Sequence, residues 1–146
     1  STRETLLTIF SPCTYSKQEL TAVFGTEWAN NFLLPSIMEI RQKQSYLRRL
    51  TALQACSMMA TKMDSDTERL EVLPLVLEMA TDTVPNIRFN VAKELEIITP
   101  NCGVSAYESQ VHPVLIMLLE DDDRDVRFFA EKTETALNKY FSSLAT

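Results

Sequence analysis

The sequence predicts an all-α protein, an α-α superhelix built from stacked pairs of helices. Glycine is scarce, with two residues in 146, which disfavours folds that need many tight hairpins, bulges or glycine-rich phosphate loops. Apolar residues follow the i, i+3, i+4, i+7 spacing of helices that bury one face. Two residue types recur with one period of 39 residues, as Pro35, Pro74 and Pro113 and as Arg49, Arg88 and Arg127. A fixed period of this length is typical of a solenoid.

The period divides the chain into the end of one repeat and three complete two-helix repeats. We expect residues 1–25 to contain the last helix of a preceding repeat and a long connection. Residues 26–64, 65–104 and 105–146 are expected to form one repeat each, the last of them C-terminal.

The first helix of each repeat contains the repeated proline about two turns from its start. Proline removes a backbone hydrogen bond and clashes with the carbonyl four residues earlier, so we expect a bend there. Ser105 and Glu108 match a capping box, which predicts that the first helix of the third repeat starts at Ser105. One apolar stripe follows in that helix, formed by Val111, Val114, Leu115 and Leu118.

The second helix of each repeat also has an apolar stripe. In the second repeat the stripe consists of Ile87, Val91, Leu95 and Ile98. In the third repeat it consists of Val126, Phe129, Ala130, Thr133, Leu137, Tyr140 and Phe141. Because neither helix of a pair can bury its stripe alone, neighbouring repeats must stack to form a continuous core.

The turns between the two helices contain recurring charged residues. Six residues before the repeated arginine, the second and third repeats have Asp82 and Asp121, whereas the first has Lys43. An arginine fork can bind a carboxylate through two parallel hydrogen bonds. We therefore expect Asp82 with Arg88, and Asp121 with Arg127, to form links within or between neighbouring turns.

Charge, hydropathy and cysteine spacing exclude several classes of function. The net charge of −6 repels a phosphate backbone, so no nucleic-acid partner is expected. The longest apolar run, Val114–Leu119, is far shorter than the roughly 20 residues of a membrane-spanning helix, so no membrane partner is expected. Cys13, Cys56 and Cys102 are too widely spaced to suggest a zinc site or a disulfide framework, and we expect an intracellular protein.

The sequence contains no pattern that indicates catalysis or a bound metal. His112 is the single histidine and has no nucleophile or second ligand at a suggestive spacing. Residues 121–125 have the D-x-D-x-D pattern of a calcium loop, but Val126 replaces its glycine and Lys132 its final glutamate. We therefore expect a protein that is not an enzyme and has no cofactor and no metal ion.

Apolar residues occupy two of the turns, where solvated turns usually have Gly, Asn, Asp or Ser. They are Tyr46 and Leu47 in the first turn and Val84 and Pro85 in the second. From the residues alone, they either contact a protein partner or pack locally beneath the turns. The charge of the turns changes from positive in the first to negative in the third, which either orients a partner or forms a solvated rim.

The repeat resembles a HEAT repeat, which has a bent first helix, a short turn with Asp and Arg, and a second helix. Four runs further resemble the C-terminal end of the 65 kDa scaffolding A subunits, which are regulatory subunits of protein phosphatase 2A. These runs are residues 24–28 (FGTEW), 45–49 (SYLRR), 84–93 (VPNIRFNVAK) and 125–130 (DVRFFA). The stretch from Ser11 to Leu20 departs from the family pattern and looks like an insertion.

The resemblance implies a scaffold without catalytic activity, present in the cytoplasm and the nucleus. In that family the turns form a ridge that binds the phosphatase catalytic subunit, while a regulatory B-type subunit binds mainly to repeats outside this chain. Turn position and resemblance together predict a set of partner-binding residues, namely Tyr46, Leu47, Arg48, Arg49, Val84, Pro85, Asn86, Arg88, Phe89, Arg124 and Arg127. The alternative is a HEAT module of another transport or chromatin assembly that binds a peptide or helix on its concave face.

Overall fold

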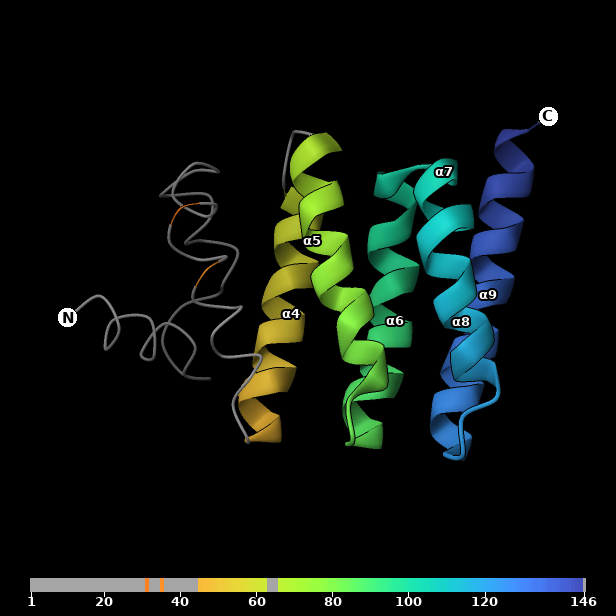
Figure 1. The fold of residues 1–146 in the computed structure, drawn as a ribbon. Coiled ribbons are helices and arrows are strands. Elements are labelled where there is room, and N and C mark those ends of the chain that lie inside the picture. Colours follow the sequence, from red (N-terminus) through yellow and green to blue (C-terminus); the bar gives the residue numbers. More distant parts are fainter. Residues whose placement is uncertain (1–30, 32–34, 36–44, 63–65, 146) are drawn as a thin grey trace.

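The computed structural model describes residues 31, 35, 45–62 and 66–145 (Figure 1). Over these residues every regular element is helical, which confirms the predicted all-α superhelix. Predictions about residues 1–25, including the insertion, lie outside the described part of the chain.

The described elements follow one another with short connections. They are α4 (Tyr46–Lys62), α5 (Asp66–Glu78), the 3-10 turn η2 (Met79–Thr81), α6 (Pro85–Cys102), α7 (Val104–Ala106), the π-helical segment η3 (Tyr107–Val111), α8 (His112–Leu119) and α9 (Arg124–Leu144).

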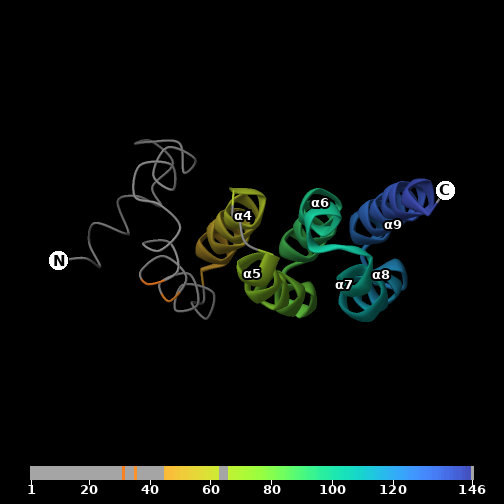
Figure 2. The ribbon, with the colours of Figure 1, turned by 90° about the horizontal axis from the view of Figure 1, so that it is seen from above.

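The helices form two layers. Seen from above, α4, α6 and α9 form one row, and α5 lies with α7 and α8 in the other (Figure 2). Helix α6 packs against both α4 and α9, and α8 packs against α9. Each helix pair therefore contacts the next along the chain, as a solenoid requires.

The core confirms the repeat register that the sequence predicts. Equivalent positions of successive repeats are buried to the same degree, with relative exposures of 0 or 1%. On the first helices these are the pairs Val72 and Val111, and Val76 and Leu115; on the second helices they are Ala52, Val91 and Ala130. The apolar face of each helix thus points into one continuous core.

Pro74 and Pro113, in the first helices of the second and third repeats, are accommodated differently. Pro74 lies inside α5, which stays α-helical from Asp66 to Glu78. Pro113 is near the start of α8, directly after the π-helical segment η3. A wider helical turn lets the backbone continue where proline lacks an N–H and crowds the carbonyl four residues earlier. In the third repeat the proline therefore accompanies a change of helix type.

The predicted start of a helix at Ser105 is wrong. Helix α7 begins at Val104, and Gly103 is its N-cap residue with φ of 88°. A left-handed backbone suits glycine, and it reverses the chain between α6 and α7 within a single residue. Ser105 consequently lies inside the first turn, where its carbonyl accepts a hydrogen bond from Ser109 Oγ at 2.7 Å, and no side chain caps α7.

None of the described helices combines the length and the apolar character that crossing a membrane requires.

Candidate functional site

The intra-repeat turns lie together at one edge of the superhelix. The start of α4, the turn from α5 to α6 and the turn from α8 to α9 all lie at the lower edge in Figure 1. We call this edge the ridge, and define it as residues 45–49 (turn one), 82–88 (turn two) and 120–127 (turn three).

Turns two and three have the same backbone structure because an aspartate folds each of them. Asp82 Oδ1 accepts a hydrogen bond from the Val84 amide at 2.9 Å, and Asp121 Oδ1 accepts one from the Asp123 amide at 2.9 Å. The residue that donates this amide is itself extended, with φ and ψ of −91° and 117° at Val84 and of −83° and 128° at Asp123. The next residue begins the second helix, and in turn two it is Pro85, whose fixed φ suits a first helical position.

Arginine and aspartate side chains join each turn to the next. Arg49 binds Asp82 with Nε to Oδ2 at 2.6 Å and Nη2 to Oδ1 at 3.0 Å. Arg88 binds Asp121 in the same way, at 2.7 and 2.9 Å. We call these two pairs the arginine–aspartate ladder. All four side chains are at most 16% exposed, so water screens the ladder less than it screens a surface ion pair.

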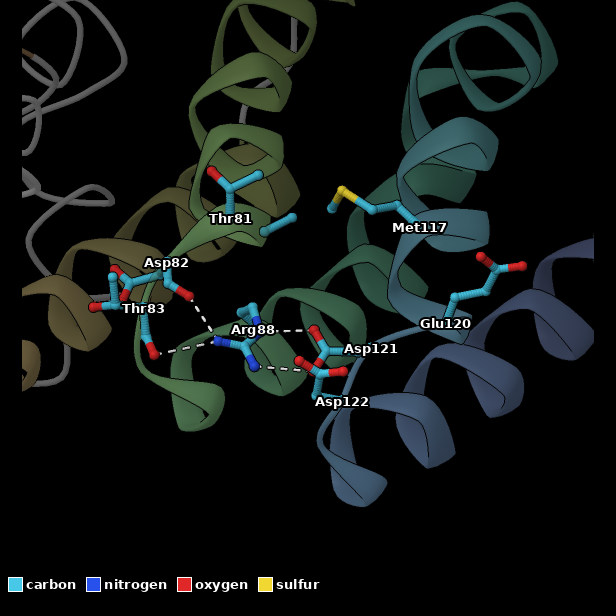
Figure 3. Close-up of a pocket in the computed structure, with 9 residues that line it drawn as sticks. Thr81, Asp82, Thr83, Arg88, Met117, Glu120, Asp121 and Asp122 are labelled. Carbon is cyan, nitrogen blue, oxygen red and sulfur yellow. Dashed lines mark hydrogen bonds and ion pairs between the residues drawn. The ribbon is translucent and has the colours of Figure 1, made fainter.

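Within a turn, the arginine binds backbone carbonyls. Arg88 Nη1 donates to the carbonyl of Asp82 at 2.8 Å and to that of Thr83 at 3.3 Å. Arg127 Nη1 donates to the carbonyls of residues 121 and 122 at 2.6 and 3.0 Å. The predicted carboxylate pairs, Asp82 with Arg88 and Asp121 with Arg127, are therefore wrong. Each carboxylate binds the arginine of the preceding turn, and the arginine of the same turn binds the backbone carbonyl of the aspartate, because stacking brings the two turns together (Figure 3).

The second pair of the ladder, Arg88 and Asp121, shows shifted pKa values. The hydrogen bond from Arg88 lowers the pKa of the Asp121 carboxyl below its usual value, against the opposing effect of burial. The same hydrogen bond raises the pKa of the Arg88 guanidinium. Both groups are therefore charged at neutral pH, and their ionisation stabilises the fold.

Six of the predicted partner-binding residues are exposed on the ridge. The relative exposures of Tyr46 and Leu47 are 41% and 59%. The other exposed residues are Arg48, Pro85, Arg124 and Arg127.

The other five predicted residues are partly buried and have contacts within the protein. Arg49 and Arg88 belong to the ladder. Phe89 stacks on Phe129 of the next repeat, with ring centroids 5.4 Å apart. Asn86 accepts a hydrogen bond from the Asn90 amide at 2.7 Å, and Val84 packs against the core. Tyr46, Leu47 and Pro85 therefore supply the exposed apolar surface of the predicted set.

A groove between turns two and three contains residues that the sequence did not single out. Its volume is about 450 Å³, and Figure 3 shows the Met117 side chain extending toward Thr81 across it. Met117 is 44% exposed because it lies outside the apolar stripe of α8. Its position outside the stripe is the one sign in the sequence that Met117 faces the surface. The lining residues are Ala80, Thr81, Asp82, Thr83, Arg88, Met117, Glu120, Asp121 and Asp122.

The aspartate run of turn three has structural contacts. Asp121 binds Arg88, and Asp123 caps α9 by accepting hydrogen bonds from the amides of Asp125 and Val126 at 2.9 and 3.1 Å. Over the residues described, no three His, Cys, Asp or Glu side chains form a group that could hold a metal ion.

Comparisons with known proteins point to phosphatase regulatory subunits. The chain is 29% identical over 124 residues to the regulatory A subunit of protein phosphatase PP2A from Saccharomyces cerevisiae, covering 80% of this chain and 20% of that protein. It is 48% identical over 52 residues to the Drosophila melanogaster PP2A 65 kDa regulatory subunit, covering 36% of this chain and 9% of that protein. It is 28% identical over 114 residues to the human serine/threonine-protein phosphatase 4 regulatory subunit 4, covering 78% of this chain and 13% of that protein. No family model matches the chain.

The chain thus spans about a fifth or less of the length of these relatives. All three are named as regulatory subunits, so the similarity groups this chain with proteins that are not enzymes themselves.

Proposed function

We propose that this chain is a scaffold segment whose ridge binds the catalytic subunit of a serine/threonine phosphatase of the 2A type and so contributes to holoenzyme assembly. The observation that carries the proposal is the exposed apolar surface of Tyr46, Leu47 and Pro85 on an edge held by the arginine–aspartate ladder. Its similarity to phosphatase regulatory subunits supports this class of partner.

The rigidity of the ridge favours binding. The ladder and the aspartate-folded turns fix the backbone before a partner arrives, so little conformational entropy is lost on association. Tyrosine is a favoured interface anchor because its ring buries a large area while its hydroxyl keeps a hydrogen-bond partner. We therefore expect Tyr46 to contribute more to affinity than any charge at the rim of the ridge.

Replacing Tyr46 with alanine tests the proposal. With a purified 2A-type catalytic subunit, we expect the dissociation constant measured by calorimetry to rise about tenfold or more, as for a buried interface anchor. The matched control is Tyr140→Ala, because Tyr140 is 39% exposed but lies near the C-terminal end of α9, away from the ridge. An unchanged dissociation constant for a folded Tyr46→Ala variant, or an equal loss with Tyr140→Ala, contradicts the proposal.

A phosphatase 4 catalytic subunit is the second candidate partner. The similarity to phosphatase 4 regulatory subunit 4 covers 78% of this chain, nearly the same share as the similarity to the yeast PP2A subunit. Titrating the chain with the two catalytic subunits under identical conditions decides between them, since the cognate subunit should bind at least tenfold more tightly.

The peptide-binding alternative predicts that a different substitution weakens partner binding. Ile97 of α6 is 54% exposed and lies in the row of second helices, two-thirds of the way along its helix from the ridge. Under our proposal Ile97→Glu leaves the affinity for the catalytic subunit within twofold. A protein that binds its partner along the second helices should lose affinity with Ile97→Glu and keep it with Tyr46→Ala.

A further inference from the structure

The groove between turns two and three has an exposed methionine on one side. Met117, near the C-terminal end of α8, is 44% exposed, and its side chain extends toward Thr81 of η2 (Figure 3). The equivalent position of the second repeat is occupied by Glu78, a charged residue. Methionine is flexible and polarizable, and it is common on surfaces that bind other proteins. Met117 therefore gives the groove an apolar contact for a partner.

The groove also has negative charge that the ladder leaves unpaired. Four carboxylates and one guanidinium line it. The arginines of the ladder bind two of the carboxylates, those of Asp82 and Asp121. The side chains of the other two, Glu120 and Asp122, have no hydrogen bond or ion pair with any residue that the structure describes. The groove thus combines an apolar side with two unpaired acidic groups.

This charge favours an organic cation as the occupant. Glu120 and Asp122 are both exposed, and exposed side chains change rotamer within nanoseconds, so each can turn toward a cation in the groove. A metal ion is a poor occupant, because the described residues include no group of three His, Cys, Asp or Glu side chains that could hold one. An acidic side chain would be repelled by the two carboxylates.

A lysine or arginine side chain matches both features of the groove. Such a side chain lays its aliphatic stem along an apolar surface and keeps its charged end near carboxylates and water. The groove volume of about 450 Å³ leaves room for it. Because the groove lies between two turns of the ridge, a partner docked on the ridge passes directly over it.

We propose that this groove binds a lysine or arginine side chain of the docked catalytic subunit, whose stem contacts Met117 and whose cation pairs with Glu120 and Asp122. The inference rests on the proposed function and adds the chemistry of the partner between turns two and three. It assigns an apolar contact to turn one and an ionic contact to the groove, so the two contacts can be tested separately.

Neutralising the two unpaired carboxylates tests the inference. For the double variant Glu120→Gln with Asp122→Asn, we expect the dissociation constant for the 2A-type catalytic subunit to rise about fivefold, because two ion pairs are lost. The difference should shrink to within twofold in about 0.5 M NaCl, since salt screens exposed charges. The matched control is Glu71→Gln with Glu108→Gln, which removes two exposed charges outside the groove and should stay within twofold.

Replacing Met117 with alanine tests the apolar side of the groove. We expect the dissociation constant to rise about threefold, because the stem of the bound side chain loses a contact. The altered side chains of all these variants are exposed, so the variants should keep the fold, which circular dichroism checks.

Several results would overturn the inference and leave the proposed function standing. One is a loss of affinity with Tyr46→Ala while the carboxylate variant stays within twofold. A loss with Met117→Ala alone would mean an apolar occupant, and a loss with the carboxylate variant that does not change with salt would mean that charge is not its cause. If the groove variants alter only self-association of the chain, measured by analytical ultracentrifugation, the occupant is a second copy.

Failure of the proposed function gives a different result. In that case the unmodified chain binds neither of the two catalytic subunits, and the inference fails with it.

Discussion

Arg88 makes contacts that hold two turns at once. Its Nε–Nη2 edge binds Asp121 of the next turn, and its Nη1 binds the carbonyls of Asp82 and Thr83 in its own turn. No single ammonium group can reproduce this planar arrangement of donors. The ladder therefore depends on arginine and not on positive charge alone.

Arg88→Lys should destabilise the protein by about 1–3 kcal/mol, because it removes charge-assisted hydrogen bonds and leaves a carboxylate that is 12% exposed without its fork. Urea unfolding followed by circular dichroism measures the loss. Arg124→Lys is the control at a 90% exposed side chain and should change the unfolding free energy by less than about 0.5 kcal/mol. Equal effects of the two substitutions would show that the ladder contributes nothing to stability.

At the scale of the element, the second helices contain two buried threonines with different hydrogen bonding. Thr133 of α9 is 1% exposed and its hydroxyl donates to the Ala92 carbonyl of α6 at 2.8 Å, which joins neighbouring repeats. Thr99 of α6 is fully buried, and its hydroxyl has no hydrogen-bond partner among the described residues. A buried hydroxyl without a partner costs free energy, whereas a bonded one stabilises the contact.

Valine substitutions at these two positions should therefore have opposite effects. Thr99→Val should leave the unfolding free energy unchanged or raise it by up to about 1 kcal/mol, because no hydrogen bond is lost. Thr133→Val should lower it by about 1 kcal/mol. Thermal unfolding of both variants beside the unmodified chain checks the prediction, which is wrong if Thr99→Val proves the more destabilising substitution.

At the scale of the whole molecule, stability comes from contacts between neighbouring repeats. Helix α6 lies between α4 and α9, and a continuous core runs through all three. The ladder adds charged links between the same repeats at the ridge. Protonating a ladder carboxylate should therefore weaken the stacking of repeats and not only one turn.

Acid should destabilise the protein partly through Asp121. Its pKa is lower in the folded protein, chiefly because of the hydrogen bond from Arg88, so this contribution is present above the unfolded pKa of about 3.9 and is lost as the pH falls through the folded value. Asp121→Asn should lower the urea midpoint at pH 7, and its difference from the unmodified chain should shrink as the pH falls below about 4. The exposed Asp122, replaced by asparagine, is the control. A difference between Asp121→Asn and the unmodified chain that is constant from pH 7 to pH 3 contradicts the prediction.

The sequence by itself determined the helix pairs and their register. A 39-residue period and apolar helical spacing are properties of the linear chain, and they identified buried residues such as Val91, Leu115 and Ala130. They also identified the turns as the position of the candidate site. The prediction at Ser105 was wrong because the left-handed conformation of Gly103 moves the helix start by one residue.

The tertiary structure alone decided which charged groups meet and which candidate residues remain exposed. Arg88 lies six residues from Asp82 and 33 from Asp121, yet its fork binds the distant carboxylate, because stacking brings the next turn within reach. Phe89 and Phe128 occupy equivalent positions of the repeat, but Phe89 is partly buried against Phe129 whereas Phe128 is 59% exposed. Both phenylalanines follow the repeated arginine, so the repeat pattern does not distinguish them. Their exposure depends on what packs next to them, which only the folded chain shows.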